Sequence, residues 1–356
     1  MNTAKGGGHT ITERSERVLI TGANGFIGSN LCRYFLDRSY EVVALVRGSS
    51  NLSFLEGLPV QLVRADLSQP TAPVLPPGIR YVIHAASLAF EGMSFPEARR
   101  HIVDTTANLL RGLQEQRSGL KRFVYISSVL VLGHRSTGIS EEHPGRPARG
   151  IMPYMRGKQM AEALLQEEFR ERGLPLVILR PSDVFGPNDR TSSLRLLREM
   201  EKGWPSLVGS GRRLMSFCYV ENLCQACLLA CQMKGANGSA YTVTNGQEMT
   251  WRQLMGHFRS RLGRPQRLYV PFPVAYALSA TMQVLHALAP RARLPLASIY
   301  PVAKLGRDTT YDISRTCAEL GYRPDQDVEK QMDAIVGWYR AEKAAGRLDS
   351  VGRGQA

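Results

Sequence analysis

The stretch Val18–Leu31, VLITGANGFIGSNL, constrains the fold of this chain more than any other feature. Three glycines, Gly22, Gly25 and Gly28, lie between an apolar run and the start of a helical pattern. The first two let the backbone turn tightly and approach a pyrophosphate, and the third lets the helix pack closely on the strand. The start of that helix offers free N–H groups and a positive dipole end to phosphates. The stretch therefore predicts a dinucleotide-binding turn after a first buried strand.

Strand and helix patterns alternate after this turn. Short apolar runs predict strands at 17–22, 41–46, 60–66, 79–86, 121–129 and 174–181, and helical patterns cover 26–38, 95–116 and 154–172. This alternation is typical of the α/β class, with a Rossmann-type doubly wound parallel sheet. Beyond Pro187, helical patterns dominate at 193–202, 220–233 and 251–262, which predicts a smaller, mainly helical C-terminal substrate lobe.

We divide the chain accordingly into four parts. A flexible N-terminal tail is expected over 1–16, and an NADP-binding Rossmann domain over 17–187, with later segments crossing back to it. A mostly substrate-binding lobe is expected over 188–340, and a flexible C-terminal tail over 341–356. We find neither a secretory signal pattern nor an apolar run long enough to predict a membrane span.

Charge and cysteine content limit the partners, the metal sites and the cellular compartment that we expect for the protein. The chain carries 45 Lys and Arg against 31 Asp and Glu, a formal charge of +14, which by itself does not choose among acidic partners; we expect no nucleic-acid partner. Three of the six cysteines lie in CQACLLAC, spaced as on one face of a helix. Packed, reduced cysteines are the simplest interpretation, so we predict no metal site and a cytoplasmic location, with membrane association as an option.

The end of the second predicted strand selects the dinucleotide. A carboxylate there would bind the adenosine ribose, whereas an arginine accommodates a 2′-phosphate. Here the strand ends ALVRGSSN, with Arg47 at the expected position and no acid. Arg47, with the hydroxyls of Ser49 and Ser50, suits charge-assisted phosphate binding, although a solvated surface arginine is the simpler alternative. We predict NADP, with NAD as the alternative, and expect Asp66 beside the adenine.

A tyrosine and a lysine in YMRGK supply the candidate chemistry. Tyr154 and Lys158 are four residues apart, so they share one face of a helix. A free tyrosine has a pKa of about 10, and a neighbouring ammonium is expected to lower that pKa toward a useful value. Ser127 and Ser128 follow a predicted strand, at the sheet edge where ligands bind. A serine hydroxyl there can hold a carbonyl or alkoxide oxygen.

These motifs together resemble the extended short-chain dehydrogenase/reductase superfamily, which includes sugar-nucleotide epimerases and 3β-hydroxysteroid dehydrogenases. The resemblance runs from about Val18 to Tyr339 and rests on TGANGFIG, VIHAAS, LRPSDVFGP, FCYVENL and DISRTCAELGYRP. It implies that Tyr154 is the acid/base and that Lys158 is its partner and grips the nicotinamide ribose. The glycine in SVLVLG favours Ser128 over Ser127 as the catalytic serine.

The resemblance also implies a set of cofactor contacts, with Pro181 to Val184 passing beside the nicotinamide carboxamide. The predicted cofactor-binding residues are Gly22, Asn24, Gly25, Phe26, Ile27, Gly28, Arg47, Ser50, Asp66, Leu67, Ala85, Ala86, Tyr154, Lys158, Pro181 and Val184. One position departs from the family pattern: Ile102 stands where an asparagine is usual, which argues against a proton relay through that position.

Two further departures narrow the choice within the superfamily. Dehydratases carry an Asp-Glu pair after the catalytic residue, whereas Val129 follows Ser128 here. Nucleotide-sugar epimerases place an arginine and an aspartate before their Y-V-x-D motif, where this chain has Met215 and Ser216. The sequence is closest to the 3β-hydroxysteroid dehydrogenase branch. A catalytically inactive relative would be expected to lack the tyrosine or the lysine, and both are present.

A long apolar segment in the C-terminal part has two interpretations. Residues 271–290 are bounded by proline and flanked by arginines on both sides. Such a segment could touch an anionic membrane surface or cap an apolar pocket; the alternative is an ordinary packed helix. We predict an NADP(H)-dependent oxidoreductase that interconverts a secondary alcohol and a ketone on an apolar, sterol-like or β-hydroxy-acyl-like small molecule. A nucleotide-sugar epimerase with tightly bound NAD is the alternative, and a homodimer stays an option.

Overall fold

The computed structural model describes residues 15–88, 93–133, 137–143, 152–203, 207–235, 238–265, 269–288, 302 and 305–347, with the backbone alone for 283–288. Most of the expected N-terminal tail and residues 348–356 of the expected C-terminal tail lie outside these ranges.

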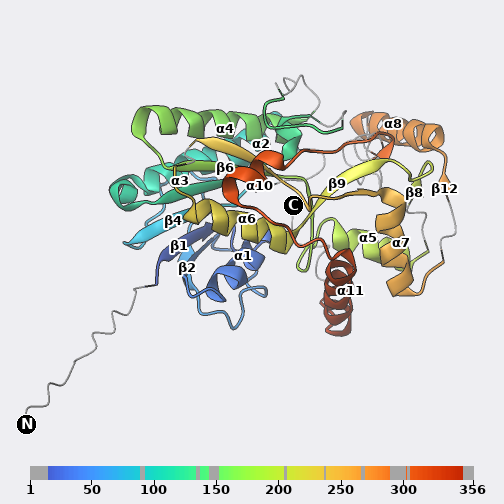
Figure 1. Ribbon diagram of the computed structural model, residues 1–356, viewed down its shortest axis with the longest axis horizontal. Helices are drawn as coiled ribbons and strands as arrows, with labels where there is room; N and C mark the ends of the chain where they lie inside the picture. The colour runs from blue at the N-terminus through green and yellow to red at the C-terminus, as the bar shows by residue number, and fades with distance from the viewer. Residues whose placement is uncertain are drawn as a thin grey trace, which may run out of the picture.

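A seven-stranded parallel sheet forms the N-terminal part of the molecule (Figure 1). The strand order is β10-β6-β5-β4-β1-β2-β3, and every neighbouring pair is parallel. The strands are β1 Arg17–Thr21, β2 Glu41–Val46, β3 Gln61–Arg64, β4 Ile79–His84, β5 Arg122–Ile126, β6 Leu176–Pro181 and β10 Ser239–Val243. The predicted Rossmann-type fold class is confirmed.

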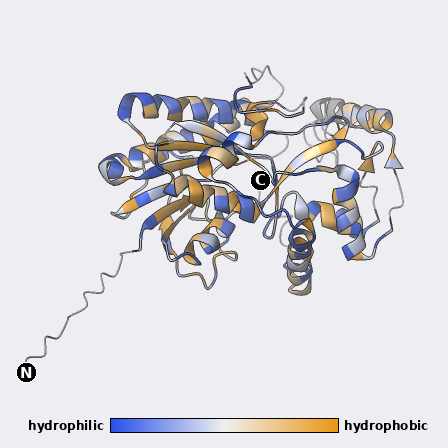
Figure 2. Ribbon diagram, viewed as in Figure 1, coloured by the Kyte–Doolittle hydropathy of each residue, from blue (hydrophilic) through white to orange (hydrophobic). Residues whose placement is uncertain are grey.

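Each face of the sheet has its own hydrophobic core, and the strands are largely apolar (Figure 2). Along β1, Val18 and Ile20 face one core while Leu19 faces the other, because side chains alternate along a strand. The first core lies under helices α1 (Phe26–Leu36) and α6 (Val220–Gln232). The second lies under α3 (Thr105–Gly112) and α4 (Pro153–Arg172).

The helix expected over 95–116 is divided in the structure. It consists of α2 (Phe95–Ala98), a π-helical turn η1 (Arg99–Asp104), α3, and a 3-10 turn η2 (Gln114–Gly119). Gly157 of α4 lies against this π turn, since a Cβ at Gly157 would lie 2.9 Å from Ile102. Ile102 is therefore a buried packing residue between two helices.

The C-terminal lobe packs beside the carboxyl end of the sheet (Figure 1). Its small sheet has the order β11-β9-β7, and β8 pairs with β12. The elements are β7 Asp183–Phe185, α5 Ser193–Glu201, β8 Leu207–Val208, β9 Leu214–Tyr219, β11 Glu248–Thr250, α7 Trp251–Leu262, β12 Tyr269–Val270, α8 Phe272–Leu288 and α11 Val328–Ala344. Helix α10 (Ser314–Leu320) crosses back and packs on β10 and α6 of the large sheet. The helix α11 runs past residue 340, where we expected a tail, because Tyr339 and Glu342 are buried in it.

Candidate active site

The glycine turn has the geometry that a close-packed nucleotide loop needs. Gly22 has φ +65°, and a Cβ there would lie 3.0 Å from Cα of Ala86. A Cβ on Gly28 would lie 2.7 Å from Cα of Ala23 and overlap the backbone of Gly22. The helix α1 begins at Phe26, and no side chain caps its first N–H groups. The turn therefore carries no side chains that would block a phosphate group from the free N–H groups at the start of α1.

A buried histidine braces this turn. Thr21 Oγ1 lies 2.8 Å from Nδ1 of His84, and Thr106 Oγ1 lies 3.1 Å from its Nε2. The hydroxyl of Thr106 donates to the carbonyl of Ile102, so it accepts from the histidine ring. Burial, and then the nearby charge of Lys158, lower the pKa of His84 to about 3. His84 is therefore a neutral structural residue at the end of β4.

Thr21 in turn fixes the loop after β4. Its Oγ1 accepts a hydrogen bond from the backbone N–H of Ala86 at 3.1 Å. Ala85 and Ala86 are both half-buried and follow the end of β4 directly. The structure thereby brings the predicted VIHAAS segment against the glycine turn. Asn24 and Ile27, also predicted contacts, lie at the same turn, where Asn24 Nδ2 donates to the carbonyl of Asn51 at 3.4 Å and Ile27 packs on the core.

The residues predicted for the adenosine end gather beyond β2 and β3. Arg47 is exposed, and its charge acts on the half-buried carboxyl of Asp66. Burial raises the pKa of Asp66, but hydrogen bonds from Ser68 and this charge outweigh it and hold the pKa below its usual value. Leu67 is buried, and its carbonyl accepts from Asn108 Nδ2 at 2.7 Å. Ser50 Oγ is buried and has no hydrogen-bond partner in the structure.

Helix α4 carries the candidate residues Tyr154 and Lys158 on one face, as their spacing predicts. Lys158 is fully buried and donates from Nζ to the carbonyl of Ile126 at 2.7 Å. Its Nζ lies 5.8 Å from the ring centroid of Tyr154 and 4.8 Å from that of Tyr125. The lysine therefore ties α4 to the carboxyl end of β5.

The protonation of this pair differs from the sequence-based expectation. Burial raises the pKa of Tyr154 to about 12, whereas we expected Lys158 to lower it. Burial also lowers the pKa of Lys158 to about 7, although the carboxylate of Glu162 opposes this change. The reason is that the lysine is itself desolvated and directs a hydrogen bond at Ile126. At neutral pH it carries only part of its charge, and Tyr154 keeps its proton.

A partly buried ion pair follows one helical turn later. Glu162 accepts hydrogen bonds from Nε and Nη2 of Arg180 at 3.0 and 2.6 Å. Arg180 lies on β6, directly before Pro181. This bidentate pair joins helix α4 to the strand that leads into β7. Its carboxylate is the nearby charge that favours the ammonium form of Lys158.

Ser128 opens onto a small pocket at the carboxyl end of β5. The residue caps a 3-10 turn, η3 (Val129–Val131), and its Oγ accepts from the N–H of Leu130 at 3.2 Å, which leaves the hydroxyl proton to donate. Ser127 is buried, and its Oγ has no partner in the structure. The pocket is lined by Ser128, Val129, Leu130, Ser182, Asp183, Met215, Ser216, Thr309 and Tyr311.

The predicted segment Pro181–Val184 borders this pocket through Ser182 and Asp183. Pro181 ends β6, and Val184 pairs in parallel with Cys218 of β9. These residues therefore carry the chain from the large sheet into the small one, beside Ser128. Tyr154 is not among the residues that line the pocket.

Sequence reasoning missed the pocket residues that come from the far end of the chain. Thr309 pairs with Met215, and the N–H of Tyr311 donates to Ser216 Oγ at 3.0 Å. The hydroxyl of Tyr311 reaches back to the carbonyl of Gly133 at 2.7 Å. No local motif in DTTYD signals this position, because it arises from a pairing between strands that are distant in the sequence.

Residues 18–244, more than half of the chain, match the model of the NAD dependent epimerase/dehydratase family. The chain belongs to this family. The resemblance to extended short-chain dehydrogenase/reductases is confirmed, as is the expectation of an NAD(P)-dependent enzyme.

Relatives within the epimerase/dehydratase family cover nearly the whole chain. The chain is 28% identical to 4-hydroxy-2-methyl-3-oxo-4-farnesyl-3,4-dihydroquinoline-1-oxide ketoreductase of Stigmatella aurantiaca, over 90% of this chain and 95% of that protein. It is 27% identical to 3 beta-hydroxysteroid dehydrogenase/Delta 5-->4-isomerase of Mycobacterium tuberculosis, over 95% and 97%. UDP-glucuronic acid 4-epimerase from Bacillus cereus, solved with NAD, shares the fold with a TM-score of 0.71 at 21% identity, over 91% and 99%.

The residues of this family member fit a dinucleotide. At Gly22 and Gly28 the backbone packs so closely that an added Cβ would meet neighbouring backbone atoms, and α1 presents uncapped N–H groups at this turn. The unpartnered hydroxyl of Ser50 and the exposed guanidinium of Arg47 lie beyond β2, where the ribose of a dinucleotide belongs. Among the described residues, no cluster of His, Cys, Asp and Glu could hold a metal ion, and all six cysteines are free.

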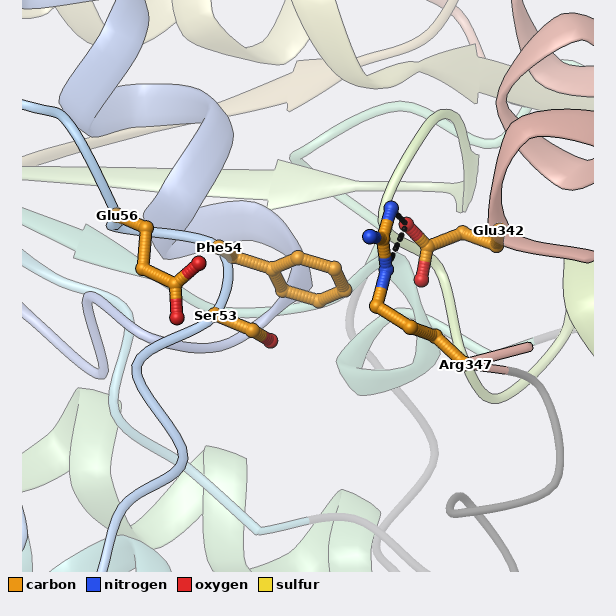
Figure 3. A pocket seen from close by; sticks show the side chains of 5 residues that line it. All are labelled: Ser53, Phe54, Glu56, Glu342 and Arg347. Atoms are coloured by element: carbon orange, nitrogen blue, oxygen red, sulfur yellow. Dashed lines mark hydrogen bonds and ion pairs between the residues drawn. The ribbon is translucent and has the colours of Figure 1, made fainter. Parts of the chain in front are cut away.

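The structure has a second hollow, away from the pocket at Ser128. It is lined by Ser53, Phe54, Glu56, Glu342 and Arg347, where the loop after β2 meets the end of α11 (Figure 3). Arg347 donates to Glu342 at 2.7 Å, and the guanidinium of Arg190 stacks over Phe54 at 4.2 Å. None of the predicted site residues lines this hollow, so we interpret it as the junction between the Rossmann sheet and α11.

Proposed function

We propose that this protein is an NADP(H)-dependent oxidoreductase that interconverts a secondary alcohol and a ketone on a largely apolar, sterol-like or β-hydroxy-acyl-like substrate. Ser128, Tyr154 and Lys158 carry the reaction. The observation that supports this most is the hydrogen bond from Lys158 to Ile126. It brings the tyrosine's helix to the strand end from which Ser128 opens onto a pocket.

The protonation of Tyr154 supports a role as acid. With a pKa raised to about 12 by burial, the phenol holds its proton at neutral pH. In the reducing direction, Ser128 donates a hydrogen bond to the substrate carbonyl oxygen, and Tyr154 protonates that oxygen as the alkoxide forms. NADPH held at the glycine turn would supply the hydride for the carbonyl carbon. Lys158, with a pKa of about 7, can return a proton to the tyrosine near neutral pH.

The lining of the pocket supports a neutral, apolar substrate. Met215 and Ser216 are buried and occupy the wall where a nucleotide-sugar epimerase would place an arginine for the substrate phosphates. Val129 and Leu130 add apolar surface. The relatives named a ketoreductase and a 3 beta-hydroxysteroid dehydrogenase act, by their names, on such molecules.

The cofactor side of the proposal rests on Arg47 and Ser50. A 2′-phosphate would pair with the guanidinium of Arg47 and accept a hydrogen bond from the unpartnered hydroxyl of Ser50. This favours NADP over NAD, with Asp66 beside the adenine.

Purified protein incubated with NADPH and a panel of apolar ketones tests the proposal through the fall in NADPH absorbance. Tyr154→Phe should reduce turnover by about a hundredfold or more, because it removes the proton donor, and should leave NADPH binding nearly unchanged. Unimpaired turnover in this variant would exclude the proposed acid. Epimerised product from UDP-sugars, without net change in cofactor, would favour the alternative epimerase.

A further inference from the structure

The outer face of α8 is apolar, exposed and free of charge. Val274, Leu278 and Met282, four residues apart on one face of the helix, expose 49%, 60% and 45% of their surface. Tyr276, on the other side of the buried stripe, exposes 43%, and Tyr269 just before the helix exposes 42%. These five are more than half of the strongly exposed large apolar residues in the described part of the chain. The helix α8 lies on the rim of the C-terminal lobe (Figure 1). A patch of this kind marks an interaction surface.

The helix is held by a narrow stripe that leaves this face free. Ala275 and Ser279, one turn apart, are buried, and the residues between them are exposed. Phe272 packs against Gly306, where an added Cβ would overlap its ring. The attachment therefore orients the exposed apolar side chains away from the lobe.

The sequence on both sides of α8 is rich in positive charge. Residues 249–307 contain nine Lys and Arg and no Asp or Glu, which is most of the chain's net charge of +14. Some of these are satisfied within the lobe: Arg261 pairs with Glu329 and Asp333 of α11. Arg252 and Arg307 are exposed near α8: Arg252 donates to the hydroxyl of Tyr269 at 2.6 Å, and Arg307 follows Gly306, which packs on Phe272.

We propose that the exposed face of α8 binds the surface of an anionic lipid bilayer. Apolar side chains without charges enter the headgroup region, while the surrounding arginines meet acidic lipid headgroups. A second copy of this chain is a poorer occupant, because a two-fold contact would place like charges against each other. Within the described residues no helix is long and apolar enough to cross a membrane.

Co-sedimentation of the full chain with lipid vesicles tests this proposal. The wild type should bind vesicles of phosphatidylcholine mixed with phosphatidylglycerol, and bind far less to phosphatidylcholine alone or at high salt. The double variant L278Q/M282Q should bind the mixed vesicles at least about tenfold more weakly than the wild type, since it removes two exposed apolar side chains. Arg307→Gln, beside the Gly306 that packs on Phe272, should weaken binding about fivefold, in a salt-dependent way.

The matched control changes exposed apolar residues elsewhere. Leu62→Gln and Val74→Ser, on the Rossmann part, are also exposed and should bind vesicles like the wild type. Equal binding to neutral and anionic vesicles, or an equal loss in the control variants, would overturn the proposal. So would a concentration-dependent dimer, seen by light scattering, that L278Q/M282Q dissociates. Binding is measured without substrate, so its failure is distinct from failure of the proposed reductase activity.

Discussion

Nζ of Lys158 lies 2.7 Å from the carbonyl oxygen of Ile126 and donates a hydrogen bond to it. This contact joins the second turn of helix α4 to the carboxyl end of β5. Tyr154 lies one turn before the lysine, and Ser128 lies two residues beyond Ile126. One buried side chain thus brings together the two segments that carry the proposed chemistry. Burying its ammonium group away from water lowers the stability of the folded chain.

That cost predicts a specific dependence of stability on pH. The pKa of Lys158 falls from its usual 10.5 to about 7 on burial, so between these values the unfolded chain binds more protons than the folded chain. Stability from this group therefore rises with pH from about 7 to 10.5, and the full cost is present below about 7. Urea unfolding should show that Lys158→Met is most favoured relative to wild type at low pH, with a difference that shrinks above neutrality. Exposed Lys202→Met should follow the wild-type profile throughout.

The two adjacent serines should separate in a kinetic test. Ser128→Ala removes the donor to the substrate oxygen and should lower kcat by about a hundredfold. Ser127→Ala removes a buried hydroxyl without a partner and should leave kcat within a few-fold of the wild type. Steady-state kinetics with the best ketone substrate decides between them. Equal losses in both variants would contradict the assignment of Ser128.

The choice of dinucleotide should depend on one exposed arginine. Arg47→Ala removes a charge-assisted contact to a 2′-phosphate and should raise the Kd for NADPH about tenfold or more while changing that for NADH little. Fluorescence titration with both nucleotides measures this. Arg38→Ala, whose guanidinium stacks on Tyr34, is the control and should change neither Kd. An unchanged preference for NADPH in Arg47→Ala would remove this role.

The glycine turn should tolerate no side chain at its third glycine. A Cβ in Gly28→Ala would lie 2.7 Å from the backbone of Ala23, so helix and strand must separate. We expect loss of nucleotide binding together with a lower Tm. Gly337→Ala is the matched control: it lies in the interior of α11 with no atom near its Cβ position, and should keep or slightly raise Tm. Normal nucleotide affinity in Gly28→Ala would show that the turn is looser than its geometry implies.

The elements that follow from local pattern were predictable. The first six strands and helices α1 and α4 lie where the apolar runs and helical periods indicated, because burial on both faces of a parallel sheet leaves a direct signature. Strand β10 was not predicted: it follows a helical part of the chain, and its pairing with β6 depends on a segment about sixty residues away. The π turn before α3 was not predicted either, because it packs against Gly157 of α4, a helix that is distant in the sequence.

The sequence by itself determined the parallel sheet, the glycine turn and the residue types at the candidate site, because these depend on spacing along the chain and on the backbone freedom of particular residues. Only the tertiary structure decided how those residues are charged and what surrounds them. Burial gives Tyr154 a raised pKa and Lys158 a lowered one, against the expectation from their proximity alone. Desolvation depends on every atom packed around a group, and Thr309 and Tyr311 reach the pocket only because distant strands pair.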